Sequence, residues 1–128
     1  MSELGWKETE TDWHKIVTRP DIDIIDISAY DSLHYPIAKE ALLNGKQVIC
    51  EKPLANDGKQ ALELAELARE KKIRATVCTN YRYVHAIRCM KHLIDSGELG
   101  EIRHVYGSFL MDWAVNTENP MYWRLDDK

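Results

Sequence analysis

The sequence lacks the features that mark secreted, disulfide-bonded and membrane-spanning proteins. Its three cysteines, Cys50, Cys78 and Cys89, form no CxxC pair, so the sequence predicts neither a disulfide framework nor a zinc knuckle. No apolar run approaches the ~20 residues that cross a bilayer, and the first residues have neither the basic nor the apolar stretch of a signal peptide. We therefore expect a soluble, cytoplasmic protein with reduced cysteines.

The sequence also lacks a cluster of basic residues. Its 17 Lys and Arg stand against 21 Asp and Glu, a formal net charge of -4. Because nucleic-acid affinity comes mainly from neutralising phosphates, this balance argues against nucleic acid as a partner. The chain has 128 residues, 45% of them hydrophobic, which is ordinary for one globular domain that needs no metal or disulfide.

Apolar runs and amphipathic stretches alternate along the chain. Thr11 and Asp12 can cap a short helix that ends before Pro20. Runs rich in β-branched or apolar residues predict strands at 22–27, 47–50 and 75–79, with helices between them at about 32–44 and 56–71. In the second of these helices we expect Asn56 as the N-cap and Lys59 paired with Glu63 at i,i+4.

The order strand, helix, strand, helix, strand is typical of half of a doubly wound α/β domain with a parallel sheet. Beyond it we predict a helix from about His85 and one longer strand over Ile102–Met111, which has no partner in this sequence. The buried side of that helix is expected to carry four apolar residues, namely Ile87, Met90, Leu93 and Ile94. The predicted fold is thus the second half of a Rossmann domain, followed by the first helix and strand of an α+β domain.

Ligands of open α/β sheets bind beyond the carboxyl ends of the parallel strands. Three groups of polar residues follow the predicted strands, at 29–34, 51–53 and 80–82. Lys52 stands between Glu51 and Pro53, and a lysine held in this way can donate a proton or hydrogen bond to a substrate oxygen. The alternative, which the tripeptide alone leaves open, is an exposed Glu51–Lys52 ion pair in a turn.

Three potential metal ligands, His85, Cys89 and His92, are spaced i, i+4 and i+7 along one predicted helix. They lie opposite the apolar stripe, where polar residues of a solvated face are common. We therefore predict no metal site.

One family resemblance runs along most of the chain. It is carried by Asp23–Ile27, by His34, by Gly45–Ala55 with its Glu-Lys-Pro after Gly-Lys-Gln-Val, by Asn80–Tyr83, by Ser96–Ile102 and by Trp123–Arg124. In these stretches the sequence resembles the glucose-fructose oxidoreductase, inositol dehydrogenase and MocA (Gfo/Idh/MocA) family of nicotinamide-dependent sugar dehydrogenases. Its specific signal is Glu-Lys-Pro at the end of a strand.

The resemblance implies an NAD or NADP cofactor and a sugar or polyol substrate. It implies that Lys52 is the catalytic residue, beside the nicotinamide and hydrogen-bonded to the reacting hydroxyl. The cofactor contacts it implies are Ala29, Tyr30, Asp31, His34, Glu51, Lys52, Pro53, Asn80, Arg82, Trp123 and Arg124. The chain departs from the family at 29–31, where the family usually has Thr, Pro and Asn.

The family's GxGxxG turn and its catalytic Asp-x-x-x-His pair are not found in these 128 residues. We therefore expect 1–83 to form part of a dinucleotide-binding domain, and 84–128 to begin a substrate and oligomerisation domain. Hydride transfer needs cofactor, lysine and base together, so we expect these residues alone to be inactive. The alternative is a non-catalytic module that self-associates, or complements another chain, through its exposed strand.

Overall fold

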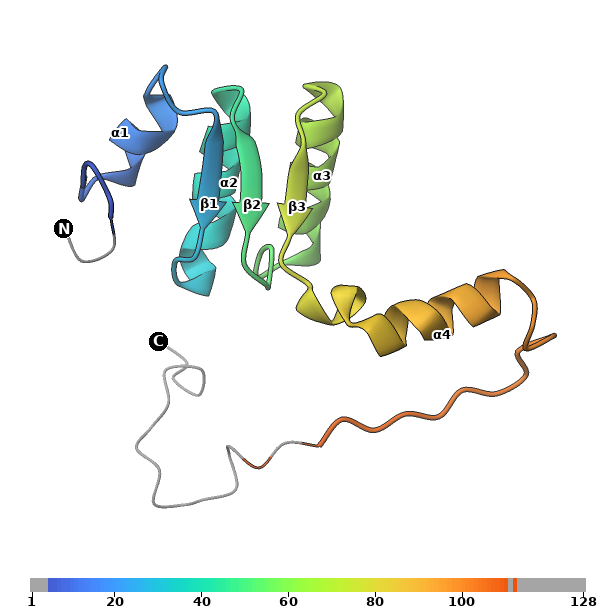
Figure 1. Ribbon diagram of the computed structural model, residues 1–128. Helices are drawn as coiled ribbons and strands as arrows, with labels where there is room; N and C mark the ends of the chain where they lie inside the picture. Colours follow the sequence, from blue (N-terminus) through green and yellow to red (C-terminus); the bar gives the residue numbers. More distant parts are fainter. Residues whose placement is uncertain (1–4, 111, 113–128) are drawn as a thin grey trace. The chain divides into compact units, whose positions relative to one another are not determined.

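The computed structural model describes residues 5–110 and 112 (Figure 1). The chain separates into two compact units, 1–88 and 89–128. The first unit contains α1 (Trp13–Thr18), β1 (Ile24–Ile27), α2 (Asp31–Leu43), β2 (Gln47–Cys50), α3 (Gly58–Glu70), β3 (Ala75–Val77) and the 3-10 helix η2 (Asn80–Tyr83). Helix α4 (His85–Asp95) crosses the boundary between the units. No helix of the described residues is long and apolar enough to cross a membrane.

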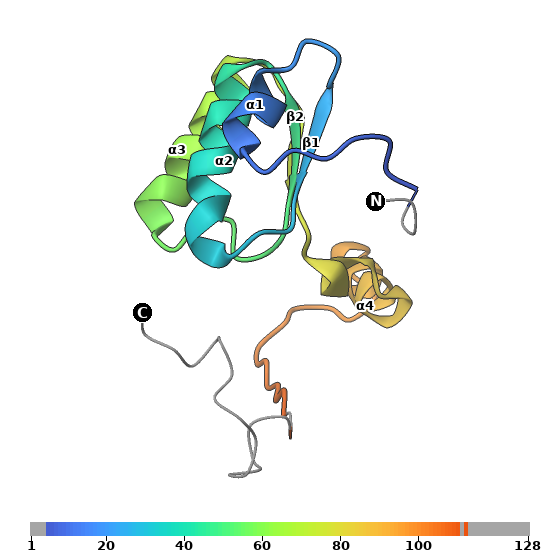
Figure 2. The same ribbon diagram turned by 90° about the vertical axis from the view of Figure 1, so that its left-hand side faces the viewer.

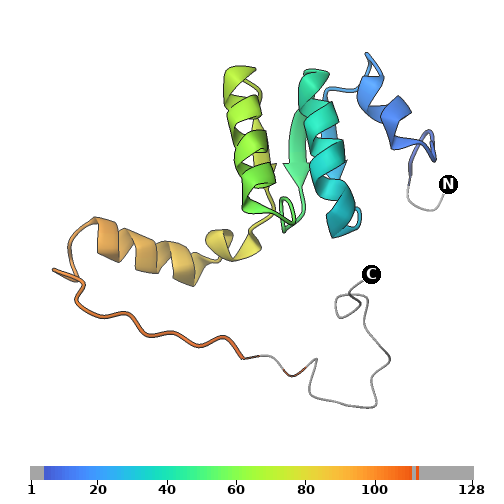
Figure 3. The same cartoon turned by 180° about the vertical axis from the view of Figure 1, so that it is seen from behind.

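The three strands form one parallel sheet in the order β1-β2-β3, which confirms the predicted α/β class. Helices α2 and α3 lie side by side on the same face of this sheet (Figures 2 and 3). The outer strands are shorter than the predicted 22–27 and 75–79. Both pair only with the four-residue β2, so the length of β2 limits the ladder on each side.

The core lies between the sheet and its helices. Alternate strand residues are buried, with Ile25 and Ile27 in β1 and Val48 and Cys50 in β2. They pack with apolar residues of the helices, namely Val17, Ile37, Ala38, Ala41, Leu42, Leu64 and Ala68. Four of these are alanine or valine, and such short side chains let helices approach a sheet closely.

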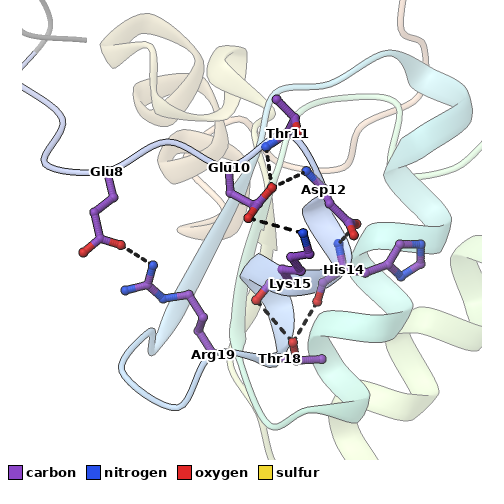
Figure 4. Close-up of polar contacts among 8 residues, drawn as sticks. All are labelled: Glu8, Glu10, Thr11, Asp12, His14, Lys15, Thr18 and Arg19. Carbon is purple, nitrogen blue, oxygen red and sulfur yellow. Dashed lines mark hydrogen bonds and ion pairs between the residues drawn. The ribbon is translucent and has the colours of Figure 1, made fainter.

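Helix α1 is fixed by its caps, as predicted for Asp12 (Figure 4). The Asp12 carboxylate accepts the His14 backbone N–H at 3.1 Å. The Glu10 carboxylate accepts the backbone N–H groups of Thr11 at 2.8 Å and Asp12 at 3.1 Å, and these bonds lower the pKa of Glu10. Two of the free N–H groups at the helix start, those of Asp12 and His14, are thus satisfied by nearby carboxylates, as is the N–H of Thr11 just before the helix.

A buried lysine fixes the turn between α1 and β1. Lys46 is 8% exposed, and its ammonium donates to the carbonyls of Arg19 at 2.5 Å and Ile22 at 2.7 Å. The Arg19 guanidinium bonds both carboxylate oxygens of Asp21, at 2.9 and 2.6 Å, and also contacts Glu8. This polar cluster lies at the amino edge of the sheet.

Two details of α3 differ from the prediction. Its N-cap is Asp57 rather than Asn56, because the helix begins at Gly58 and the Asp57 carboxylate accepts the Lys59 N–H at 2.6 Å. The Glu63 carboxylate pairs with Lys39 at 2.6 Å and accepts the Tyr35 hydroxyl at 2.7 Å, and among the described ion pairs it has none with Lys59. A partner on the neighbouring helix α2 replaces the expected one within α3.

The predictions for the later part of the chain were wrong in two respects. The apolar residues Ile87, Met90 and Ile94 of α4 are exposed, at 41, 50 and 43%, rather than buried. Residues 102–110 form no strand, and Met111 lies outside the described residues. A strand needs hydrogen bonds to a neighbour, and among the described residues none pairs with this segment.

Candidate active site

Three turns follow the strands at the carboxyl edge of the sheet. The parallel ladder continues one residue beyond β2 and β3, since the Glu51 N–H donates to the Ile27 carbonyl at 2.9 Å and the Cys78 N–H to the Cys50 carbonyl at 2.8 Å. These bonds bring the turn after β1 beside the turn after β2, and the latter beside the turn after β3. The predicted groups at 29–34, 51–53 and 80–82 therefore follow neighbouring strands at one edge.

Lys52 is exposed in the turn after β2. No described residue forms an ion pair or hydrogen bond with its ammonium. The half-buried Glu51 instead accepts the backbone N–H of Lys52, at 3.3 Å, and the Lys52–Pro53 peptide bond is cis. The alternative of a Glu51–Lys52 ion pair is thus not observed, and the ammonium is available to a ligand.

His34 is buried behind two of the turns, with 1% of its surface exposed. Its Nδ1 lies 2.6 Å from the Pro53 carbonyl oxygen and its Nε2 lies 3.0 Å from the Ala29 carbonyl oxygen. A neutral imidazole donates to one of these carbonyls, and the imidazolium donates to both. Both ring nitrogens therefore face protein carbonyls, whereas the resemblance implies that His34 contacts the cofactor.

The turn after β1 presents a large exposed side chain. Tyr30 is 68% exposed and occupies the N-cap position of α2, where its side chain makes no capping hydrogen bond. Asp31 follows in the first helical turn, where a carboxylate is favoured by the helix dipole. A flat ring and a carboxylate thus stand where the family usually has Pro and Asn.

Two cysteines lie beneath this edge. Cys50 is fully buried, and burial, with a smaller contribution from Cys78, raises its pKa to about 11. Burial also raises the pKa of Cys78, and the neighbouring Glu51 carboxylate adds to the effect. Both groups are protonated thiols at neutral pH, which suits packing rather than nucleophilic chemistry.

The remaining predicted contacts are distributed differently. Asn80 and Arg82 are exposed on η2, after β3, whereas Trp123 and Arg124 lie outside the described residues. An apolar groove of about 620 Å³ lies beside β3 and α3, lined among others by Leu64, Ala68, Val77 and Arg82. Its lining includes Arg82 of the third turn, but not Lys52, Glu51 or His34.

The structure also bears on the metal alternative. In the part of the chain that is described, which includes His85, Cys89 and His92, no three His, Cys, Asp or Glu side chains are arranged to hold a metal ion.

Sequence reasoning missed the hydrogen bonds that hold the turns at the two edges of the sheet. The bridge made by His34 and the carbonyls bound by Lys46 depend on backbone oxygens, which carry no signal in the sequence. Knowing that His34 and Lys46 are buried would have suggested these hydrogen bonds, but the sequence around the two residues does not indicate that they are buried.

Comparison with known proteins identifies the family of the chain. Residues 2–79 match the family described as "Oxidoreductase family, NAD-binding Rossmann fold". Levoglucosan dehydrogenase of Pseudarthrobacter phenanthrenivorans is 36% identical over 121 residues, which are 94% of this chain and 31% of that protein. The chain thus spans about a third of the length of this relative.

Two solved structures share the fold. An oxidoreductase domain protein from Kribbella flavida is 41% identical with a TM-score of 0.89, over 97% of this chain and 34% of that one. Levoglucosan dehydrogenase in complex with NADH and levoglucosan is 35% identical with a TM-score of 0.87, over 95% of this chain and 33% of that one. Because the family match covers more than half of its residues, the chain belongs to the glucose-fructose oxidoreductase, inositol dehydrogenase and MocA family of NAD-binding oxidoreductases.

Proposed function

We propose that these residues form one side of a dinucleotide site, and carry the active-site lysine of an NAD(P)-dependent oxidoreductase that acts on a hydroxyl or carbonyl of a sugar or polyol. The observation that carries this proposal is the exposed Lys52 ammonium, which has no described partner at the carboxyl edge of the parallel sheet. The relatives named as levoglucosan, D-xylose and inositol dehydrogenases support the substrate class.

Lys52 is suited to bind the reacting oxygen. Its ammonium offers three N–H donors on a flexible stem, so it can hydrogen-bond a substrate hydroxyl or give a proton to an oxygen that becomes negatively charged. A bound nicotinamide supplies the hydride donor or acceptor. Lys52 would then orient the carbon that bears the oxygen and stabilise charge on the oxygen.

The turns beside Lys52 fit a flat cofactor ring better than they fit phosphate. The exposed Tyr30 ring offers an aromatic face, whereas the carboxylates of Asp31 and Glu51 would repel a pyrophosphate. We therefore assign Ala29, Tyr30 and Lys52 to the nicotinamide side of the site. The pyrophosphate would be held by a GxGxxG turn, which these residues do not contain.

This assignment extends to the two parts of the chain. Residues 1–83 would belong to the dinucleotide-binding domain, and 84–128 would begin the substrate domain. Without the GxGxxG turn and a catalytic base, the 128 residues would bind cofactor weakly and would not turn over substrate.

The test is a titration of the chain with NADH and with NADPH, followed by energy transfer from tryptophan. We expect saturable binding that Lys52→Ala weakens about tenfold, the loss of one charge-assisted hydrogen bond. Lys71→Ala removes an exposed lysine at the end of α3 and should leave the affinity unchanged. Binding that is absent, or equally weakened by both substitutions, would overturn the proposal.

A second candidate function is self-association. It is favoured by the apolar side chains of the segment 102–110, where Val105, Tyr106 and Leu110 are 82, 86 and 91% exposed. The segment would become a strand by pairing with a second copy. Sedimentation velocity tests this function: the wild-type chain should be dimeric or larger, and Val105→Asp with Leu110→Asp should make it monomeric. A monomeric wild-type chain would exclude it.

A further inference from the structure

We infer that His34 is a positioning residue, which holds Lys52 in place from behind the turns without touching a ligand itself. The inference rests on the proposed function, because it concerns the geometry of the lysine on which that function depends. It gives His34 a different role from the direct cofactor contact that the family resemblance implies.

The bridge made by His34 joins two turns that are distant in sequence. Its imidazole lies between the Ala29 carbonyl, five residues earlier, and the Pro53 carbonyl, 19 residues later. At their roots the same turns are joined by the hydrogen bond from the Glu51 N–H to the Ile27 carbonyl. The turns after β1 and β2 are thus connected at two levels. The first is the hydrogen bond at the end of the sheet, and the second, beyond the end of the sheet, is the buried imidazole of His34.

Lys52 lies between these two levels. Its own side chain has no described partner, and its N–H makes only a long 3.3 Å contact with the Glu51 carboxylate. The next residue, Pro53, has no N–H to donate, so its carbonyl is the polar backbone group through which the turn can be held. The 2.6 Å contact with His34 is the short polar contact directly after Lys52, as the 2.9 Å bond of the Glu51 N–H is the one directly before it.

The other end of the bridge holds the turn that carries Tyr30. Ala29 directly precedes Tyr30, and its carbonyl is held by Nε2 of His34 at 3.0 Å. The Tyr30 carbonyl in turn accepts the Leu33 N–H at 2.8 Å, in the first turn of α2. One buried ring thus sets the separation between the Tyr30 side and the Lys52 side of the site.

Lys46 provides a matched control at the opposite edge of the sheet. Like His34, it is buried and faces two backbone carbonyls, those of Arg19 and Ile22. Removing it should destabilise the fold through the same physical cause, which is the loss of donors to part-buried carbonyls. It should not loosen the turns that carry Lys52 and Tyr30.

The experiment compares His34→Leu with Lys46→Met in the full chain. Urea is added so that both variants have the same free energy of unfolding, and amide hydrogen exchange is then followed residue by residue. We expect exchange at Glu51 and Leu33, whose N–H groups donate to the Ile27 and Tyr30 carbonyls in the two turns, to be about tenfold faster in His34→Leu, which corresponds to the loss of about one hydrogen bond. In Lys46→Met, exchange at these two amides should follow global unfolding only.

Conservative variants serve as the rescue arm. The side-chain amide of His34→Asn places a donor near the Nδ1 position, and that of His34→Gln places one near Nε2. We expect His34→Asn to restore slow exchange at Glu51, and His34→Gln to restore it only at Leu33. These two variants also carry the test if His34→Leu does not fold.

NADH affinity separates this inference from the proposed function. If the wild-type chain binds NADH, His34→Leu should weaken binding about tenfold and Lys46→Met should not. Affinity that falls with Lys52→Ala but not with His34→Leu would overturn the inference and leave the function intact. If the wild-type chain does not bind, the function fails, and equal exchange in the two matched variants would still overturn the positioning role.

Discussion

The backbone N–H of Glu51 donates to the carbonyl of Ile27 at 2.9 Å, one residue beyond the last residue of β2. This bond aligns the end of β1 with the turn that carries Lys52. A residue after one strand therefore becomes the neighbour of a residue after the next, although more than 20 positions separate them in the sequence. The candidate site exists because parallel strands end together.

The core should respond to the loss of one buried side chain in α3. Leu64 is 3% exposed and packs in the cluster between helices and sheet, whereas Leu62, two residues earlier, is 58% exposed. We expect Leu64→Ala to lower the free energy of unfolding by about 2 to 5 kcal/mol, from lost burial and the cavity left behind.

Urea unfolding followed by circular dichroism measures this difference. The control, Leu62→Ala, should change the free energy of unfolding by less than about 0.5 kcal/mol, as is usual for an exposed position. Similar losses for the two variants would contradict the packing described for α3.

The decrease in the free energy of unfolding at acid pH should depend on Asp21. The Arg19 guanidinium, bonded to both oxygens of this carboxylate, lowers the pKa of Asp21 from 3.8 to about 2. The lowered pKa contributes stability that is fully present above about pH 4 and is lost as the pH falls through about 2.

We therefore expect Asp21→Asn to flatten the decline in unfolding free energy between pH 4 and pH 2. The variant Arg19→Gln should flatten it similarly, and the double variant should add nothing further. Urea titrations at successive pH values provide the measurement. A slope in this range that is the same in all four proteins would contradict the pairing.

Cys50 should contribute to the decrease in the free energy of unfolding at alkaline pH. Its pKa is raised to about 11 by burial, above the usual value of 9.0. Because the folded-state pKa is the higher one, its contribution is fully present below about pH 9 and is lost as the pH rises through about 11. Cys50→Ala should reduce the decline of stability over this interval, measured as above.

Thiol labelling gives an independent check of the same burial. Cys89 is exposed and Cys50 is fully buried, so native protein treated with iodoacetamide at pH 8 should be labelled first at Cys89. Cys50 should react only at the rate of unfolding. Mass spectrometry of the peptides would contradict this order if Cys50 were labelled as fast as Cys89.

Sequence patterns predicted the order of elements well, because helices and buried strands carry local periodicities. The apolar runs at 22–27 and 47–50, and the alanine-rich helix between about 56 and 71, correspond to β1, β2 and α3. Boundaries were less predictable, since they depend on partners. The end of β1 follows the length of β2, and the cap of α3 is set by which of two adjacent residues, Asn56 or Asp57, directly precedes the helix.

Features that depend on distant partners could not be predicted from the sequence. The segment 102–111 has the composition of a strand, but a strand forms only where another backbone accepts its hydrogen bonds. The position of Lys52 at the strand ends was predictable from the order of elements. The burial of His34 was not, because it depends on two carbonyls, those of Ala29 and Pro53, whose positions arise only on folding.

The central claim is that the carboxyl edge of the sheet is the nicotinamide side of a dinucleotide site. Its most direct test is a titration of ¹⁵N-labelled chain with NADH, in which amide chemical shifts are followed by NMR. We expect the shifts to change at 28–34, 51–55 and 78–82, and not around Lys46 and Arg19 at the amino edge. Shift changes that are confined to the amino edge or to α4, or that are absent at millimolar NADH, would contradict the account.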